Sequence, residues 1–149
     1  MARAGRRLTN PFTGQTIVFV RTAEDTGGEL LELESIYGSA GDAAPPHMHP
    51  AQDEEFEVLE GEIAALVDGS ERRLVVGDAL EIPAGTVHQF RKDEGVEARL
   101  RWVTRPALRT GEFLEALFAL LSEVSEGDAG ASERLPALFE EYRDVYRPG

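Results

Sequence analysis

The chain contains three histidines, and two of them are separated by a single residue. In an extended segment alternate side chains point to the same face, so His47 and His49 should point the same way. Two imidazoles on one face can chelate a metal ion. His88, which follows a Pro- and Gly-containing segment, can supply a third nitrogen. The histidines therefore indicate a single metal site.

A carboxylate follows the histidine pair at a short interval. Glu54 lies five residues after His49, at the beginning of a strand-like run. Alternation along a strand that starts at Glu54 directs Glu55 outward and Phe56 inward. Gln52 is a weaker candidate, which we expect to support the ligands rather than bind the ion. Four metal ligands are therefore expected: His47, His49, Glu54 and His88.

The types of these ligands restrict the metal and its chemistry. The chain has no cysteine, so a metal must be bound through nitrogen and oxygen. Imidazole favours Fe, Mn, Ni, Cu, Co or Zn over Ca and Mg, and the affinity order does not choose among them. Four protein ligands leave open positions, at which a bound ion can act as a Lewis acid or activate water. We expect one divalent transition metal as the cofactor.

The order of these residues resembles the two sequence motifs of the cupin superfamily. From Gly41 to Gly61 the chain reads Gly, five residues, His, one, His, four, Glu, six, Gly. From Gly77 to His88 it reads Gly, five residues, Pro, one, Gly, two, His, and 15 residues separate the motifs. The second motif usually closes with Asn four residues after its His, where this chain has Lys92. That Asn does not normally bind metal, so the ligand set is unaffected.

The resemblance covers roughly residues 9–105 and implies an all-β fold, the cupin double-stranded β-helix or jelly-roll barrel, with the ligands converging inside it. It is compatible with quercetinase-like dioxygenases, in which case Glu54 is expected to serve as a catalytic base as well as a ligand. Cupins with the same ligands also include isomerases, decarboxylases and oxalate-cleaving enzymes. Others are non-catalytic modules that bind or sense a small ligand, because the fold does not fix the function. Whether the chain is an enzyme stays open at this point.

The elements that must position the site are short strands separated by turn signals, which is typical of a sandwich or barrel. Asp68-Gly69 fits a hairpin turn, since both residues tolerate positive φ. The expected strands cover residues 15–21, 30–37, 55–59, 62–67, 72–76, 79–82, 87–90 and 97–103.

Beyond residue 106 the apolar pattern becomes helical. Apolar residues recur at three- and four-residue intervals over 113–124, with Thr110 as the expected N-cap. Residues 122–132 are rich in Gly, Ser, Asp and Ala and predict a loop, and a second helix is expected over 135–146. We divide the chain into a β-barrel over 1–108 and a helical extension over 109–149, packed on the barrel as a lid, strap or dimer contact.

Strand parity also predicts which side chains face the interior beside the ligands. Phe56 shares the parity of Glu54, Phe90 that of His88, and Trp102 points inward if Arg101 faces solvent. These three aromatic residues are the candidate pocket residues. Simple core packing is the alternative for each of them, since most inward residues of a small barrel fill it.

The composition excludes several classes of partner. A formal net charge of −13 opposes binding to nucleic acid or to an anionic membrane surface. There is no run of 18 apolar residues and no apolar signal-peptide core after the first arginines, so we expect a cytoplasmic protein. The expected partners are a small-molecule substrate or ligand and, because cupins often pair their barrels, a second copy of the chain in a homodimer.

Overall fold

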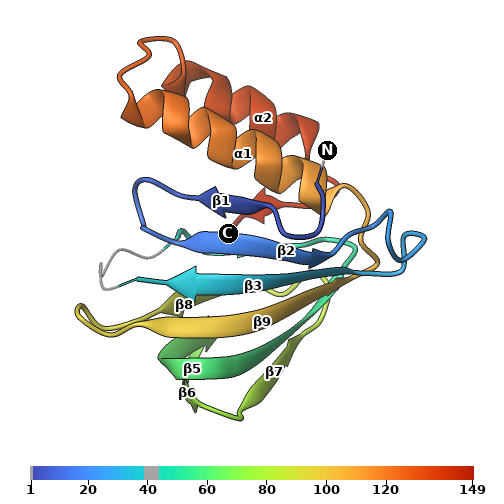
Figure 1. The fold of residues 1–149 in the computed structure, drawn as a ribbon, viewed down its shortest axis with the longest axis vertical. Helices are drawn as coiled ribbons and strands as arrows, with labels where there is room; N and C mark the ends of the chain where they lie inside the picture. Colours follow the sequence, from blue (N-terminus) through green and yellow to red (C-terminus); the bar gives the residue numbers. More distant parts are fainter. Residues whose placement is uncertain (1, 39–43) are drawn as a thin grey trace.

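The computed structural model describes residues 2–38 and 44–149, and its strands form two antiparallel sheets beneath two helices (Figure 1). Gly41, the first residue of the proposed histidine motif, lies outside the described residues. The strands are β1 (Arg7–Thr9), β2 (Thr16–Arg21), β3 (Leu31–Tyr37), β4 (His47–Met48), β5 (Asp53–Val67), β6 (Ser70–Val75), β7 (Ala79–Ile82), β8 (His88–Arg91), β9 (Ala98–Arg105) and β10 (Arg147–Pro148).

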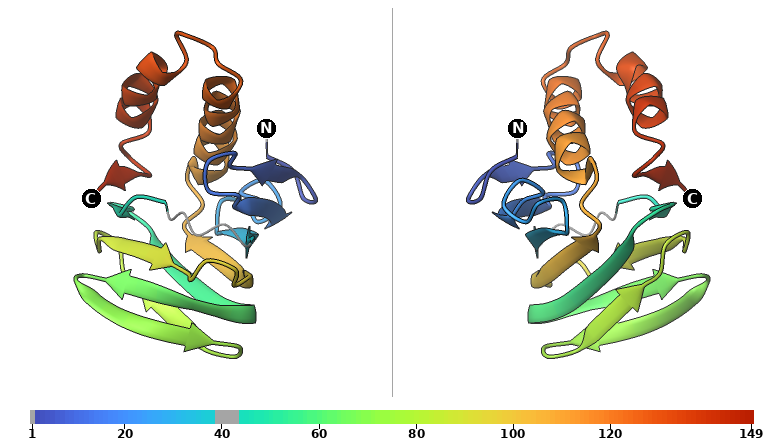
Figure 2. Two further views of the ribbon diagram at one scale, coloured as in Figure 1. Left: turned by 90° about the vertical axis from the view of Figure 1, so that its left-hand side faces the viewer. Right: turned by 90° about the vertical axis from the view of Figure 1, so that its right-hand side faces the viewer.

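The two sheets share one long strand. One sheet has the order β1-β2-β3-β9-β5-β7, and the other has the order β6-β5-β8-β4-β10. The all-β architecture expected from the turn spacing is confirmed, but the expected closure into a barrel is not, because the described strands do not close the sheet. The sandwich opens between β1 and β10, and the helices lie at that open side (Figure 2).

The shared strand β5 was predicted as two strands, over residues 55–59 and 62–67, but it is continuous. Its pairing with β9 shifts register between Val58 and Glu60. Gly61 has a φ of +73°, and a Cβ atom there would lie 1.9 Å from the carbonyl oxygen of Glu97. Only glycine fits this bend. The bend lets β5 leave one sheet and enter the other, so one strand contributes to both walls of the interior.

The interior is filled by alternate side chains from the facing sheets, as strand periodicity requires. On β5, Glu54, Phe56 and Val58 are buried, whereas Glu55 and Glu57 are partly exposed, which confirms the predicted parity. The hairpin turn at Asp68 and Gly69 is also confirmed, because both residues have positive φ.

The C-terminal elements share the core of the sheets. Helix α1 spans Thr110–Ser125, and its buried Phe113 and Phe118 belong to the same hydrophobic cluster as the strand residues. Arg109 rather than Thr110 occupies the N-cap position. A 3₁₀ turn (Ser132–Arg134) leads into α2 (Leu135–Glu141). The second helix is therefore shorter than predicted, because the chain turns after Glu141 and enters β10. No helix among the described residues is long and apolar enough to span a membrane.

Candidate metal centre

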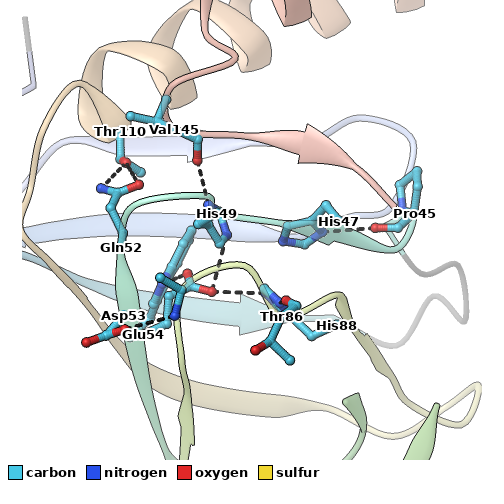
Figure 3. A network of polar contacts seen from close by, with 12 residues as sticks. Pro45, His47, His49, Gln52, Asp53, Glu54, Thr86, His88, Thr110 and Val145 are labelled. Carbon is cyan, nitrogen blue, oxygen red and sulfur yellow. Dashed lines mark hydrogen bonds and ion pairs between the residues drawn. The ribbon is translucent and has the colours of Figure 1, made fainter. Parts of the chain in front are cut away.

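The three histidines lie close together on and beside strands β4 and β8, in the sheet that also contains β10 (Figure 3). His47 on β4 is the direct pairing partner of His88 on β8, and His49 follows β4 immediately. One ring nitrogen from each of the three lies within 4.8 Å of the other two. His49 and His88 are only 5% and 3% exposed. The structure thus brings the three predicted imidazoles into one compact group.

Each imidazole is held in the same tautomer by a backbone carbonyl. The Nδ1 atom of His49 lies 2.7 Å from the carbonyl oxygen of Val145. The Nδ1 atoms of His47 and His88 lie 3.0 and 2.9 Å from the carbonyl of the residue two positions earlier. A carbonyl can only accept, so Nδ1 must carry the hydrogen and Nε2 keeps a lone pair in the neutral ring. Histidine ligands of metals are commonly oriented in this way.

Glu54 adjoins two of these imidazoles. Its Oε1 atom lies 2.9 Å from Nε2 of His88 and 3.2 Å from Nε2 of His49. These pairs lack hydrogen-bond alignment, and within the described part of the chain His49 Nε2 and Glu54 Oε1 are buried without a hydrogen-bond partner. These atoms need a cation between them, which is a proton when His49 is charged or a metal ion that takes its place. The arrangement therefore fits a metal ion, with the histidines as the compact set and Glu54 beside them.

The charges in this cluster are set by burial and by the mutual proximity of its members. Burial lowers the pKa of His47 to about 3, helped by the neighbouring His88 and His49. Burial also opposes a charge on His49, but the Glu54 carboxylate outweighs it and raises the His49 pKa above its usual value. Burial would raise the pKa of Glu54, yet His49 and His88 hold it well below its usual range. Glu54 is therefore the anion of the site.

Trp102, which was predicted to face inward, contacts the site directly. Its indole Nε1 donates a hydrogen bond of 2.6 Å to Oε2 of Glu54. The indole also stacks on Phe56 at a ring-centroid distance of 5.9 Å, and Phe56 meets Phe90 edge to face at 4.6 Å. These three aromatic residues, together with the histidines and Glu54, line one cavity.

That cavity has a volume of about 620 Å³, within the usual size of a small-molecule site. Its polar end is the cluster of histidines and Glu54, and most of the remaining wall is apolar. None of its described lining residues is a lysine or an arginine, and Glu54 is the only acidic one. The apolar part of the wall includes Phe12, Ile17, Phe56, Phe90, Trp102, Phe113, Leu114, Leu117, Phe118, Leu121, Leu135, Phe139 and Tyr146.

Gln52 was expected to support the metal ligands, but its side chain makes its hydrogen bonds elsewhere. Its side-chain amide donates to the carbonyls of Pro106 and Ala107 and exchanges hydrogen bonds with the hydroxyl of Thr110. Gln52 precedes β5, so strand parity does not govern its direction. It joins the start of β5 to the start of α1 and lies outside the metal cluster.

Sequence reasoning missed the contribution of the C-terminal segment. Val145 and Tyr146 were assigned to a helix, whereas the structure places both beside the histidines. The apolar spacing of residues 135–146 also fits a short helix followed by a turn. No local pattern distinguishes these alternatives, because the contacts that decide are made with residues almost 100 positions away.

Comparisons with known proteins agree with this geometry. Residues 37–104 match the model of the family described as Cupin domain. Quercetin 2,3-dioxygenase of Bacillus subtilis (strain 168) is 36% identical over 78 residues, which are 52% of this chain and 23% of that enzyme. The chain thus spans about a quarter of the length of this curated relative.

Two solved structures illustrate the shared fold. A sugar phosphate isomerase from a cupin superfamily, from Silicibacter pomeroyi, has 26% identity and a TM-score of 0.52, over 62% of this chain and 59% of that chain. The polyketide cyclase RemF from Streptomyces resistomycificus has 23% identity and a TM-score of 0.57, over 70% of this chain and 79% of that chain. The second likeness concerns the fold alone.

Proposed function

We propose, on the premise that residues 37–104 form a cupin domain, that the chain is a metal-dependent dioxygenase of a small aromatic substrate. One divalent transition metal would be held by His47, His49 and His88, with Glu54 as fourth ligand. The observation that carries the proposal is the convergence of unpartnered Nε2 and Oε1 atoms at the polar end of an aromatic cavity.

The chain's own residues would prepare the substrate in a defined way. A divalent ion bound there would act as a Lewis acid toward a hydroxyl or enol oxygen of the substrate. Trp102 holds Oε2 of Glu54, so Oε1 would accept the hydroxyl proton only when it leaves the ion. The surrounding aromatic rings exclude water and strengthen the electrostatic interactions at this oxygen.

The wall of the cavity favours a neutral aromatic substrate over a phosphorylated one. Phosphate and carboxylate groups are usually recognised by arginine, lysine or clustered backbone amides. The described wall offers neither lysine nor arginine, and its one acidic group is the carboxylate of Glu54. Aromatic rings such as Phe56 and Phe90 suit a flat, apolar ligand. This argues for a phenolic or enolic compound with adjacent oxygen atoms, and against a sugar phosphate.

The likeness to a quercetin dioxygenase, which is 36% identical over 78 residues, supports the same choice. A non-redox isomerase is the second possibility raised by the comparisons. An isomerase that acts on a phosphorylated or otherwise anionic substrate is disfavoured, because the described wall of the cavity has no lysine or arginine. A non-catalytic binding module would use the same cavity, and only an assay of turnover separates it from an enzyme.

The test begins with the metal content of untagged protein, measured by plasma mass spectrometry after purification without a nickel column. Oxygen consumption is then followed with a flavonol, a catechol and a sugar phosphate. We expect about one transition-metal ion per chain and oxygen uptake with the flavonol or the catechol. His49→Ala should lose both, whereas Val76→Ala, at an exposed position, should keep both. Metal bound without oxygen uptake would favour a binding module or isomerase.

A further inference from the structure

The C-terminal segment of the chain is part of the sheet that carries the histidines. Strand β10 pairs with β4, so that Arg147 lies opposite Met48 and Pro148 lies opposite His47. The pairing continues to the next residue, where the amide of Gly149 donates a hydrogen bond of 2.8 Å to the carbonyl of Pro46. Figure 3 shows this strand running alongside His47.

His49 depends on this segment for its orientation. The carbonyl that fixes the His49 tautomer belongs to Val145, 96 positions away in the sequence. His47 and His88, in contrast, use carbonyls of their own local segments. Val145 itself is fully buried, so its backbone is held firmly in place. Of the three imidazoles, His49 is thus the one whose tautomer is set by a distant part of the chain.

Tyr146 links the histidines to the helical layer. Its ring stacks on His47, with centroids 4.9 Å apart and an angle of 19° between the planes. It also meets His49 edge to face at 6.0 Å, and it stacks on Phe113 and Phe139 at 4.9 and 5.4 Å. Burial raises the pKa of Tyr146 to about 12, so the phenol is neutral in physiological buffers. The helices thereby support the face of His47.

The segment is anchored to the helical layer just before it reaches the site. Arg109, at the start of α1, binds the carboxylate of Asp144 at 2.6 Å and the carbonyl of Glu141 at 2.7 Å. The same guanidinium lies over the ring of Tyr142 at 4.5 Å. These contacts hold the turn that follows α2, so the residues entering the site start from a fixed point.

We propose that residues 145–149 are a positioning element of the metal centre. In this arrangement the Val145 carbonyl selects the Nδ1–H tautomer of His49, and the Tyr146 ring fixes the plane of His47. Both effects leave an Nε2 lone pair directed at the ion. The inference rests on the metal site proposed above, and it assigns to the C-terminal segment a role that lies outside residues 37–104.

The first test compares Tyr146→Ala with Tyr146→Phe in the full chain. Co²⁺ is titrated into metal-free protein, the affinity is measured by calorimetry, and the d–d absorption bands report the geometry of the ion. Loss of a group that orients a histidine ligand typically costs 10- to 100-fold in affinity. In Tyr146→Ala we expect the Co²⁺ affinity to fall at least tenfold and the d–d bands to change. Tyr146→Phe should keep the affinity and the bands of the parent chain, because the phenylalanine ring keeps the stack on His47.

Leu138→Ala is the matched control for loss of packing. Leu138 lies on α2 and packs against the common core, but it is not among the described residues that line the cavity. It should lower the thermal stability while leaving the Co²⁺ affinity and spectrum unchanged. Equal affinities in Tyr146→Ala, Leu138→Ala and the parent chain would overturn the proposal. A parent chain that binds no Co²⁺ would overturn the proposed function together with it.

The second test needs no metal. Long-range ¹H–¹⁵N spectra of the metal-free chain report the tautomer of each of its three histidines. We expect a proton on Nδ1 of His49 in the parent chain, and its loss when residues 145–149 are deleted, which removes the Val145 carbonyl. His88 is the internal control, because its carbonyl partner is local. An unchanged His49 tautomer would contradict the role of Val145. If His88 changes too, the variant is unfolded and the Tyr146 pair decides.

Discussion

The indole of Trp102 and the carboxylate of Glu54 form a buried hydrogen bond of 2.6 Å that joins strands β9 and β5 inside the sandwich. The bond divides the two oxygens of Glu54 between two partners. Oε2 is held by the indole, and Oε1 faces His49 and His88. The carboxylate is therefore fixed in one orientation before any ligand arrives.

Replacing Trp102 with Phe should release this carboxylate. A buried oxygen that loses its donor costs about 1–3 kcal/mol, and more if it is charged. We expect a loss of about 3 kcal/mol in the free energy of unfolding in urea, and a lower metal affinity in equilibrium dialysis. Phe56→Leu, which disturbs the same stack without removing a hydrogen bond, should lose less of both. Equal losses in the two variants would show that packing alone explains the effect.

Trp102 is the only tryptophan of the chain, so its fluorescence reports on the site. Titration of Co²⁺ or Cu²⁺ should quench the emission in a saturable curve with a stoichiometry of one, because the indole is hydrogen-bonded to Glu54, the proposed fourth metal ligand. Glu54→Gln should weaken this binding, and His88→Ala should abolish the saturable phase. Quenching that rises linearly with metal concentration in the parent chain would mean collisional contact rather than a site.

The two neighbouring histidines should differ in their effect on stability. His47 is neutral, since burial lowers its pKa to about 3, whereas His49 balances the charge of Glu54. Removing one member of a buried ion pair leaves an uncompensated charge and costs on the order of 3 kcal/mol. His49→Ala should lose about that much in the metal-free state. His47→Ala should lose about 1 kcal/mol, mainly from its aromatic contact. Both should lose the metal, and calorimetric unfolding distinguishes the two.

Gln52 should matter for stability and leave metal binding unchanged. Its amide satisfies the buried carbonyls of Pro106 and Ala107, so Gln52→Ala leaves these groups without their donor. We expect a loss of about 2–4 kcal/mol in urea unfolding. The Co²⁺ affinity of the folded variant should equal that of the parent chain. A weaker affinity would restore the idea that Gln52 supports the ligands.

The clamp between Arg109 and Asp144 should make the C-terminal segment sensitive to acid. The hydrogen bond from Arg109 holds the pKa of Asp144 below its usual value. A lowered pKa in the folded state contributes stability at pH values above the unfolded pKa of about 4, and this contribution disappears as the pH falls through the folded value. The thermal stability of the parent chain should therefore exceed that of Asp144→Asn at pH 6, and the difference should shrink towards pH 3. A difference in thermal stability that stays the same between pH 6 and pH 3 would contradict this role of the Arg109–Asp144 ion pair.

The sequence predicted both the fold class and the grouping of the three histidines. Motif spacing was sufficient to group His47, His49 and His88, and strand parity was sufficient to turn Phe56 and Trp102 inward. These are local properties, which depend on the positions of residues along one strand. The resemblance to a known family supplied the convergence of separate strands, which no local pattern contains.

The failures share a different physical origin. The break predicted between residues 55–59 and 62–67 is a bend inside β5, because a bend and a break need the same positive φ, which Gly61 has. Tyr146 was assigned to a helix, because its spacing from Leu138 and Tyr142 fits a helical period. Its real position is decided by the ring of His47 and by pairing with β4, both almost 100 residues distant. Long-range contacts of this kind leave no mark on the local pattern.

The passage of β5 through both sheets restricts how the length of this chain can vary over evolutionary time. Glu54 lies near one end of β5, and Val67 at the other end pairs with His88. Inserting or deleting one residue within β5 would reverse the faces of the strand beyond that point. A change before Gly61 would turn the Glu54 carboxylate away from the interior, and a change after it would disrupt the register with His88. Length changes at the exposed turn of Asp68 and Gly69 would leave both faces intact. In descendants of this chain, insertions should therefore accumulate at hairpin tips while β5 keeps its fifteen residues.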